Sequence, residues 1–364
     1  LQSTCSKLFH ISPDQTLQTA QRLYEAKLTT YPRTDARVLS TAVAKEIGRN
    51  VSGLSGLPKY TDVANKILAG DPTSIIGSKR YVDDSKISDH YAIIPTGQNL
   101  SALSAMSDID QSIYYLIASR FLAIFMPPAV YKKVELVENC GGERFYAGGS
   151  TLIDPGYMAL TGIPNGSSKL PVAVESLQPG QQFPCQIALF AGETTPPNRY
   201  TSGSMITAME NAGNSLEEET LKGVLKDCGI GTSSTRAAII KKLDDIGYIS
   251  INKKTQIMTP TDTGIAIYEI IKNSIPELLN PKITAQWEEG LNGIVKGQVN
   301  PNEYQNKIHE YVRNKVNDIK NMTISDDFSA YIKTFNIETK KKPGQKKVEA
   351  EAYLNLSLIH ISEP

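Results

Sequence analysis

The sequence predicts a multi-domain α+β protein that is mostly helical. Apolar residues recur at helical spacing through most of the first 127 residues, which predicts a helical domain. After Pro127-Pro128 the pattern changes to the period-two alternation that is typical of half-buried strands. Helical spacing then returns. We therefore expect four segments, namely a helical domain at 1–127, a β-rich domain at 128–198, a second helical domain at 199–322, and a tail at 323–364.

The composition is that of an ordinary globular chain with no strong charge bias. Of the 364 residues, 40% are hydrophobic and 21% are charged, and 38 basic residues balance 38 acidic ones. Cys5, Cys140, Cys185 and Cys228 are far apart and form no Cys-x-x-Cys pair, which argues against a zinc ribbon and favours a reducing compartment. The sequence contains no signal peptide and no apolar run long enough to span a bilayer. We expect a cytoplasmic protein.

Helix signals are clearest in the first segment. Ser12 can cap a helix, Pro13 suits its first turn, and Gln15 completes a capping box. Leu17, Ala20, Tyr24 and Leu28 then recur at helical spacing, so Tyr31 should lie just beyond this helix. Further helices are expected at about 41–46, ending near Gly48, and at about 113–125, ending before the prolines. Asp108-Ile109-Asp110 is interpreted as a helix N-terminus.

The second segment alternates and is interrupted by turn residues. Val130, Val134 and Leu136 predict one strand, and Phe183, Cys185, Ile187 and Leu189 predict another. Three dipeptides predict the turns between strands, namely Gly141-Gly142, Gly148-Gly149 and Pro179-Gly180.

The third segment predicts helices around one hairpin. Ile239, Ile240 and Leu243 predict a helix over 235–246 that Gly247-Tyr248 ends, and residues 248–259 alternate around a Lys253-Lys254 turn. Two later stripes predict core-facing helices, namely Trp287, Leu291 and Ile294, and then Tyr304, Ile308, Val312 and Ile319. The lysine-rich tail with Pro343-Gly344 predicts a solvated linker, and residues 354–364 are interpreted as non-native sequence.

Tyr31-Pro32-Arg33 has the residue types needed for covalent attack on a phosphate. Pro32 disfavours the α region for the residue before it, so the segment should be extended, with Tyr31 and Arg33 on one side. A tyrosine phenol has a pKa near ~10 in water, so only about one in a thousand is ionised at neutral pH. A neighbouring guanidinium favours the ionised form and can bind phosphate oxygens. A plain surface turn is the other interpretation of this run.

Longer runs around this segment resemble those of type IA DNA topoisomerases, of the topoisomerase III branch. The resemblance begins with Leu23 to Asp35 and continues, in the family's order, through about residue 320. Ser202 departs from it, because many members carry an acidic residue there. The further matching runs are Asp89-His90-Tyr91-Ala92-Ile93-Ile94-Pro95-Thr96, Thr194-Thr195-Pro196-Pro197-Asn198-Arg199-Tyr200, Ala208-Met209-Glu210-Asn211 and Gly229-Ile230-Gly231-Thr232-Ser233-Ser234-Thr235-Arg236.

The resemblance implies a toroidal core with a helical tyrosine domain, a β-rich arch and a helical, winged-helix-like base. It implies single-strand DNA cleavage through a 5′-phosphotyrosine, followed by strand passage and religation without ATP. Tyr31, Arg33 and His90 would be catalytic. Asp89 could orient the His90 imidazole, and His90 and Arg33 would stabilise negative charge in the transition state. The expected DNA contacts are Arg199, Tyr200, Thr232, Ser234, Thr235 and Arg236.

The resemblance also implies a metal-binding (Toprim) domain before the tyrosine, which this sequence does not include. We expect no metal site within the chain, Mg²⁺ bound by the missing domain in the full-length enzyme, and no relaxation of supercoiled DNA by this chain alone. The expected partner is single-stranded DNA, with no membrane association, and the expected state is a monomer.

Two other classes of protein fit parts of the sequence. A non-catalytic winged-helix DNA-binding protein would use the helix from Thr235 and the Lys253-Lys254 hairpin, but it leaves Tyr31 and His90 without a role. A tyrosine recombinase would want clustered Arg and His residues before a late tyrosine, whereas Tyr31 is early. Covalent attachment of DNA to Tyr31 separates these classes.

Overall fold

A computed structural model describes residues 1–87, 89–162, 177–182, 184, 188–215, 229–323, 325–335 and 337. The chain divides into two compact units. One unit consists of residues 1–17 and 198–364, and the other consists of residues 18–197. Each unit is described by itself below.

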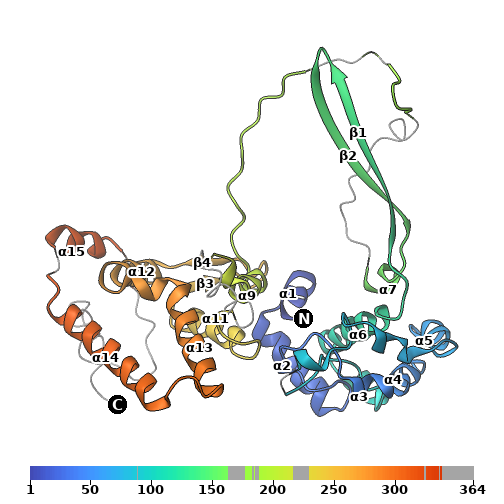
Figure 1. Ribbon diagram of the computed structural model, residues 1–364, viewed down its shortest axis with the longest axis horizontal. Coiled ribbons are helices and arrows are strands. Elements are labelled where there is room, and N and C mark those ends of the chain that lie inside the picture. The colour runs from blue at the N-terminus through green and yellow to red at the C-terminus, as the bar shows by residue number, and fades with distance from the viewer. Residues whose placement is uncertain are drawn as a thin grey trace. The chain divides into compact units, whose positions relative to one another are not determined.

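The unit of residues 18–197 is built mainly from helices, as the sequence predicts. Helix α2 (Pro13–Glu25) enters this unit at Gln18 and is followed by short helices and by the longer α6 (Figure 1). The elements between them are α3 (Thr41–Lys45), α4 (Ile47–Leu54), α5 (Thr61–Leu68), η1 (Pro72–Gly77), η2 (Asp84–Lys86) and η3 (Leu100–Ala105), and α6 spans Asp108–Ala123. The predicted helix at 41–46 is confirmed as α3, but Gly48 lies inside α4 and does not end a helix.

The start of α2 is confirmed in atomic detail, and the helix ends at Glu25, so Tyr31 lies just beyond it as predicted. The Ser12 amide donates to Gln15 Oε1 at 2.9 Å and the Gln15 amide donates to Ser12 Oγ at 3.1 Å, which completes the capping box. Thr16, Thr19, Ala20 and Leu23 are buried, while Tyr24 is 40% exposed. Of the four apolar residues at helical spacing, Ala20 and Leu28 are buried, Leu17 is half-buried and Tyr24 is exposed.

The core of this unit lies between α4, α5 and α6. Tyr60, which precedes α5, is fully buried, and its hydroxyl donates to the Tyr115 carbonyl at 2.8 Å. The Tyr60 hydroxyl also lies 2.7 Å from Ser119 Oγ, so this buried polar group is satisfied within the core. The apolar side chains that pack here include Leu54, Ile113, Tyr114 and Leu122.

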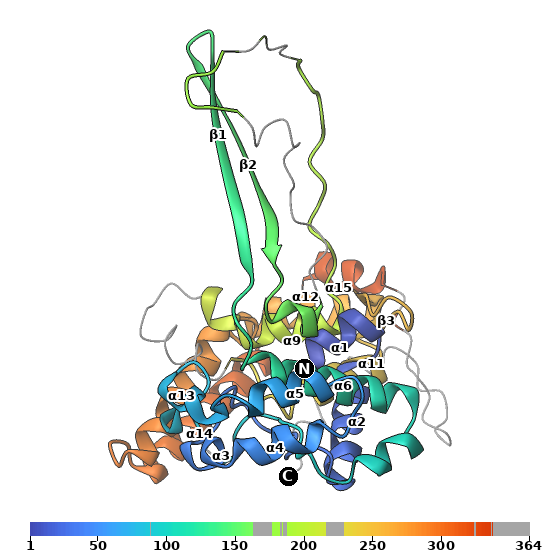
Figure 2. The ribbon, with the colours of Figure 1, turned by 90° about the vertical axis from the view of Figure 1, so that its right-hand side faces the viewer.

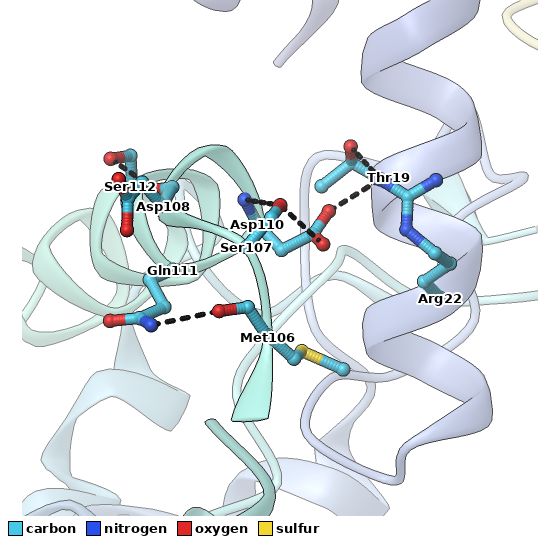
Figure 3. A network of polar contacts seen from close by, with 8 residues as sticks. All are labelled: Thr19, Arg22, Met106, Ser107, Asp108, Asp110, Gln111 and Ser112. Carbon is cyan, nitrogen blue, oxygen red and sulfur yellow. Dashed lines mark hydrogen bonds and ion pairs between the residues drawn. The ribbon is translucent and has the colours of Figure 1, made fainter. Parts of the chain in front are cut away.

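A polar network joins α2 to the N-terminus of α6 (Figure 3). The Arg22 guanidinium donates to the buried Asp110 carboxylate and to the Thr19 hydroxyl, and Ser107 Oγ donates to the same carboxylate at 2.7 Å. Ser107 also accepts from the Asp110 amide, so Asp108–Asp110 begins a helix as predicted. Burial alone would raise the pKa of the Asp110 carboxyl, but the hydrogen bonds from Arg22 and Ser107 and the Arg22 charge hold that pKa below its usual range.

A long β-hairpin follows the prolines, and the short helix α7 (Met158–Thr161) comes after it. Strand β1 (Val130–Cys140) pairs antiparallel with β2 (Glu143–Asp154), and the two strands run side by side in Figures 1 and 2. Gly141 and Gly142 have positive φ and form the predicted turn. Gly148-Gly149 lies within β2, so the turn predicted there is wrong.

The structure does not support the strand that Phe183, Cys185, Ile187 and Leu189 predict, at the one of these residues that it describes. Phe183, Cys185 and Ile187 lie outside the described residues. Leu189 is described in no strand and is fully exposed, so it is not half-buried as expected.

The unit of residues 1–17 and 198–364 is helical around one small hairpin. Strands β3 (Ile249–Ile251) and β4 (Met258–Pro260) pair antiparallel on either side of Lys253-Lys254, which confirms the predicted hairpin. Ile206, Ile240 and Met258 form its buried apolar cluster. The other elements are α1 (Gln2–Phe9), α9 (Ser202–Glu210), η4 (Ala212–Ser215), α11 (Arg236–Asp245), α12 (Asp262–Ser274), η5 (Pro276–Leu279), α13 (Pro281–Val295), α14 (Pro301–Lys320) and α15 (Asp326–Lys333).

In this unit, the predicted helix ends agree with the structure better than the predicted buried faces of the helices do. Gly247 has φ +79° after α11, and the Tyr248 amide donates to the Leu243 carbonyl at 2.9 Å, so the helix ends as predicted. The core-facing stripe of α13 is only partly confirmed. Trp287 packs edge-on against Tyr311 of α14, but Leu291 is 47% exposed.

Replacing Asp110 should show how much the α2–α6 network contributes to stability. We expect Asp110→Asn to lower the free energy of unfolding by about 2 kcal/mol at pH 7, because the Arg22 guanidinium loses its charged acceptor. The folded-state pKa is lowered, so this contribution is complete above the unfolded value of about 3.9 and is lost as the pH falls through the folded pKa.

Urea unfolding of both proteins between pH 7 and pH 2.5 measures this difference. Asp108→Asn is the matched control, because it removes an exposed charge from the same helix N-terminus without touching Arg22. An equal loss of stability in the two variants would show that the helix end, rather than the ion pair, accounts for the effect.

Candidate active site and nucleic-acid interface

The segment that carries Tyr31 begins at a tight turn after α2. Lys27 adopts the left-handed region, with φ 60°, and its amide donates to the Tyr24 carbonyl at 2.8 Å. The Leu28 amide donates to the Leu23 carbonyl at 2.9 Å, which closes the turn at the end of the helix. Beyond this turn the chain is non-helical through residue 40, as Pro32 predicts.

A second segment, residues 92–96, pairs with the Tyr31 segment through backbone hydrogen bonds. Thr30 N donates to the Ile94 carbonyl, and Thr96 N donates to the Leu28 carbonyl, each at 2.9 Å. The Ala92 amide donates to the Val38 carbonyl, also at 2.9 Å. The Thr30 hydroxyl accepts from the Ile94 amide at 3.0 Å and donates to the Ala92 carbonyl at 3.3 Å. Two stretches more than fifty residues apart are thereby held in register.

Helix α4 contacts the end of the second segment, at Pro95 and Gly97. Asn50 Nδ2 donates to the Pro95 carbonyl at 2.9 Å. Gly53 and Gly97 meet so closely that a Cβ at Gly53 would lie 2.1 Å from the Gly97 oxygen, and Gly97 itself has φ +74°. Only glycines fit this crossing, so it fixes the path of the chain that leaves the paired segment.

The pairing brings His90 against Tyr31, as the sequence predicts. Their ring centroids are 4.4 Å apart and the ring planes are tilted by 45°. The Thr34 hydroxyl donates to the His90 carbonyl at 2.8 Å and accepts from the Ala36 amide at 3.0 Å. Tyr31 is half-buried, and His90 is exposed. The nucleophile candidate and its imidazole neighbour are thus open to a ligand while their backbones are fixed.

The two charged candidates beside these rings are exposed. Within the described residues, Arg33 makes no ion pair or hydrogen bond, so its guanidinium is available to an anion. Asp89 is also exposed, and in the described part of the chain it makes no hydrogen bond to the His90 ring. The expected orienting role of Asp89 therefore has no support.

The other unit carries Arg199 and Tyr200 at the start of α9. Arg199 is exposed, and Tyr200 is 54% exposed while its carbonyl accepts from the Met258 amide of β4 at 2.8 Å. Ser202, where the sequence departs from the family pattern, is fully buried and donates to Gln256 Oε1 at 2.9 Å. The phenol ring of Tyr200 is thus presented to solvent from a fixed backbone, which suits stacking on a base.

The loop before α11 presents a cluster of hydroxyl groups. Thr232 Oγ1 lies 2.9 Å from Ser234 Oγ and 3.1 Å from Thr235 Oγ1, and both threonines are exposed. Arg236 behaves differently from the expectation. It is 6% exposed, and its guanidinium donates to the carbonyls of Ile230 and Gly231 at 3.1 Å and 2.9 Å. This arginine holds the loop in place instead of facing a ligand.

The described residues do not fit a magnesium site. They contain no group of three or more His, Cys, Asp or Glu side chains placed to bind a metal ion. The Asp110 carboxylate is occupied by Arg22 and Ser107. Among the described helices, none combines the length and the apolar character needed to cross a membrane.

Two residues near Tyr31 were not identified as site residues from the sequence. Tyr24 lies edge-on against the Tyr31 ring, with centroids 5.4 Å apart. Thr34 supports His90, and no pattern in the sequence predicts that contact.

Known proteins are similar to this chain over most of its length, including residues of both units. The chain matches the family model described as DNA topoisomerase over residues 1–306. It is 34% identical over 328 residues to DNA topoisomerase 3 of Bacillus licheniformis and 34% identical over 331 residues to DNA topoisomerase 3 of Bacillus subtilis. Each alignment covers 88% of this chain and 44% of the relative, so the chain spans less than half the length of these proteins.

A solved structure agrees with the expected fold class. Full-length topoisomerase I from Thermotoga maritima matches with a TM-score of 0.57 and 21% sequence identity, covering 86% of this chain and 48% of that chain. The names of the relatives agree with the topoisomerase III branch, and none supports a non-catalytic DNA-binding protein. Because the family match extends through residue 306 and includes Tyr31, His90 and the loop before α11, the chain belongs to the DNA topoisomerase family.

Proposed function

We propose that this chain is the strand-cleaving part of a type IA DNA topoisomerase, with Tyr31 as the nucleophile. The observation that supports this most strongly is the Tyr31–His90 pair, with ring centroids 4.4 Å apart and the exposed Arg33 two residues along the chain. A phenol beside two groups able to carry positive charge suits attack on a phosphodiester, whose transition state concentrates negative charge.

In the proposed reaction the phenolic oxygen of Tyr31 bonds to phosphorus and the bond from phosphorus to the 3′-oxygen breaks. The products are a 5′-phosphotyrosyl strand and a free 3′-hydroxyl. Arg33 and an imidazolium at His90 stabilise the phosphoryl oxygens during the transfer. One phosphoester replaces another, so the step needs no ATP, and attack by the 3′-hydroxyl reverses it.

The exposed Arg199, Tyr200, Thr232 and Thr235 and the half-buried Ser234 are proposed to bind a single DNA strand. Arg199 would contact phosphate and Tyr200 would stack on a base, while Thr232, Ser234 and Thr235 would donate to phosphate oxygens. The burial of Arg236 favours an indirect role, in which it holds the loop that presents these hydroxyls.

Strand passage and religation by the whole protein are also proposals, because the chain spans 44% of the length of its Bacillus relatives. Mg²⁺ bound by a domain outside this sequence, action as a monomer and a cytoplasmic location belong to the same proposal. The 1–127, 128–198 and 199–322 domain boundaries also remain predictions. A winged-helix protein without catalysis would explain the β3–β4 hairpin but not the Tyr31–His90 pair.

The decisive experiment asks whether Tyr31 becomes attached to DNA. A single-stranded oligonucleotide with a bridging 3′-sulfur at each candidate linkage is suitable, because sulfur leaves as a thiolate without needing protonation. We expect the chain to form a covalent adduct, seen as a shifted band in a denaturing gel, and we expect Tyr31→Phe to form none. Tyr131→Phe, which removes a phenol from β1 instead, serves as the control. Adduct formation by Tyr31→Phe would contradict the assignment.

Replacing Arg33 tests the charge beside the nucleophile. Arg33→Ala should slow adduct formation at saturating DNA by about 100-fold, because its charge acts where the transition state concentrates negative charge. Its dissociation constant for the oligonucleotide, measured by fluorescence anisotropy, should rise by only about threefold or less, as for one lost phosphate contact. Arg49→Ala removes an equally exposed charge from α4 and should alter neither quantity. Equal losses of rate and of affinity in Arg33→Ala would make Arg33 a phosphate anchor only.

A further inference from the structure

Tyr24 contacts the ring of the proposed nucleophile but takes no part in the mechanism above. It lies in the last turn of α2, seven residues before Tyr31. The two ring centroids are 5.4 Å apart and the planes meet at 82°, which is the edge-to-face geometry that aromatic pairs prefer. Tyr31 therefore has an aromatic neighbour from α2 as well as His90 from the second segment.

The position of Tyr24 is fixed more firmly than that of a typical exposed tyrosine. Its carbonyl accepts from Lys27 at 2.8 Å in the turn that ends α2. Arg22, two residues before it, is tied to Asp110 of α6, so the last turn of the helix cannot move freely. The Tyr24 ring thus reaches Tyr31 from a backbone that is held by its neighbours.

A structural role in the core does not explain Tyr24. Its side chain is 40% exposed, whereas Thr16, Thr19, Ala20 and Leu23 form the buried face of the same helix. Removing an exposed ring from this surface should cost little stability, because the core residues keep their contacts. Replacing Tyr24 should therefore change the rate at which Tyr31 reacts rather than the stability of the protein.

We infer that Tyr24 is a positioning residue, whose ring restricts the rotamers of Tyr31 so that its phenolic oxygen faces the phosphate. This inference depends on the proposed function, because it assigns Tyr24 a part in the same cleavage step. A tyrosine that is already restricted in the free protein loses less rotamer freedom when the reactive geometry forms. The contact uses the ring edges and faces, so the Tyr24 hydroxyl is not required.

The test uses the full chain and the oligonucleotide with a bridging 3′-sulfur. At saturating DNA, Tyr24→Leu should slow adduct formation by about 5- to 10-fold, the size expected for one aromatic contact. Tyr24→Phe, which keeps the ring, should stay within about twofold of wild type. The dissociation constant and the urea midpoint should be unchanged in both variants. Tyr131→Leu, at an exposed tyrosine of equal 40% exposure on β1, is the matched control.

Each result decides for or against the inference. An unchanged rate in Tyr24→Leu, or an equal loss in Tyr24→Leu and Tyr24→Phe, would overturn it. Weaker binding with an unchanged saturated rate would also overturn it, because Tyr24 would then be a DNA contact. If wild type itself forms no adduct, the proposed function fails, and this inference fails with it. With an active wild type, failure in the variants concerns Tyr24 alone.

A second readout does not depend on catalysis. In protein with labelled tyrosine rings, the Tyr31 ring signals should carry ring-current shifts from Tyr24 that disappear in Tyr24→Leu and persist in Tyr24→Phe. Identical Tyr31 shifts in wild type and Tyr24→Leu would show that the two rings do not pack in solution, and this result would overturn the inference.

Discussion

Backbone hydrogen bonds between the chain around residues 28–38 and residues 92–96 are the constraint on which the candidate site depends. Three of them are 2.9 Å long, and the Thr30 hydroxyl adds two more links between the same segments. Because they connect residues far apart in sequence, they place His90 beside Tyr31 with neither side chain having to hold the other. The proposed reactive groups can then remain open to a ligand while the backbone beneath them is ordered.

The surrounding helices extend this order to both ends of the paired segments. At one end, α2 leads through a tight turn into the Tyr31 segment and is tied to α6 by Arg22 and Asp110. At the other end, α4 contacts the second segment through Asn50 and through the Gly53–Gly97 crossing. The proposed chemistry therefore uses exposed side chains on buried supports, an arrangement that favours preorganisation of the transition state.

Local signals predicted much of the fold because the physics behind them is local. The capping box at Ser12, the Gly141-Gly142 turn and the Gly247 helix end each depend on a few adjacent residues, and all are confirmed.

Burial depends on distant partners and was harder to predict. Thr16 and Thr19 are polar yet buried, and their hydroxyls bond to the Ser12 carbonyl and to Arg22. Arg236 is buried because the preceding loop turns its carbonyls onto the guanidinium, a geometry that composition does not reveal. The Tyr31–His90 contact itself was predicted through the resemblance to topoisomerases, and not from spacing.

The most direct test of this account is a nuclear Overhauser measurement between the rings of Tyr31 and His90 in the full chain. With centroids 4.4 Å apart, the ring protons should give clear cross-peaks in the absence of DNA. A His90→Gln variant would assign the signals, since the same peaks must disappear from its spectrum. Absence of any cross-peak in wild type, with the Tyr24–Tyr31 cross-peaks still present, would contradict the claim that pairing of the two segments places His90 beside Tyr31.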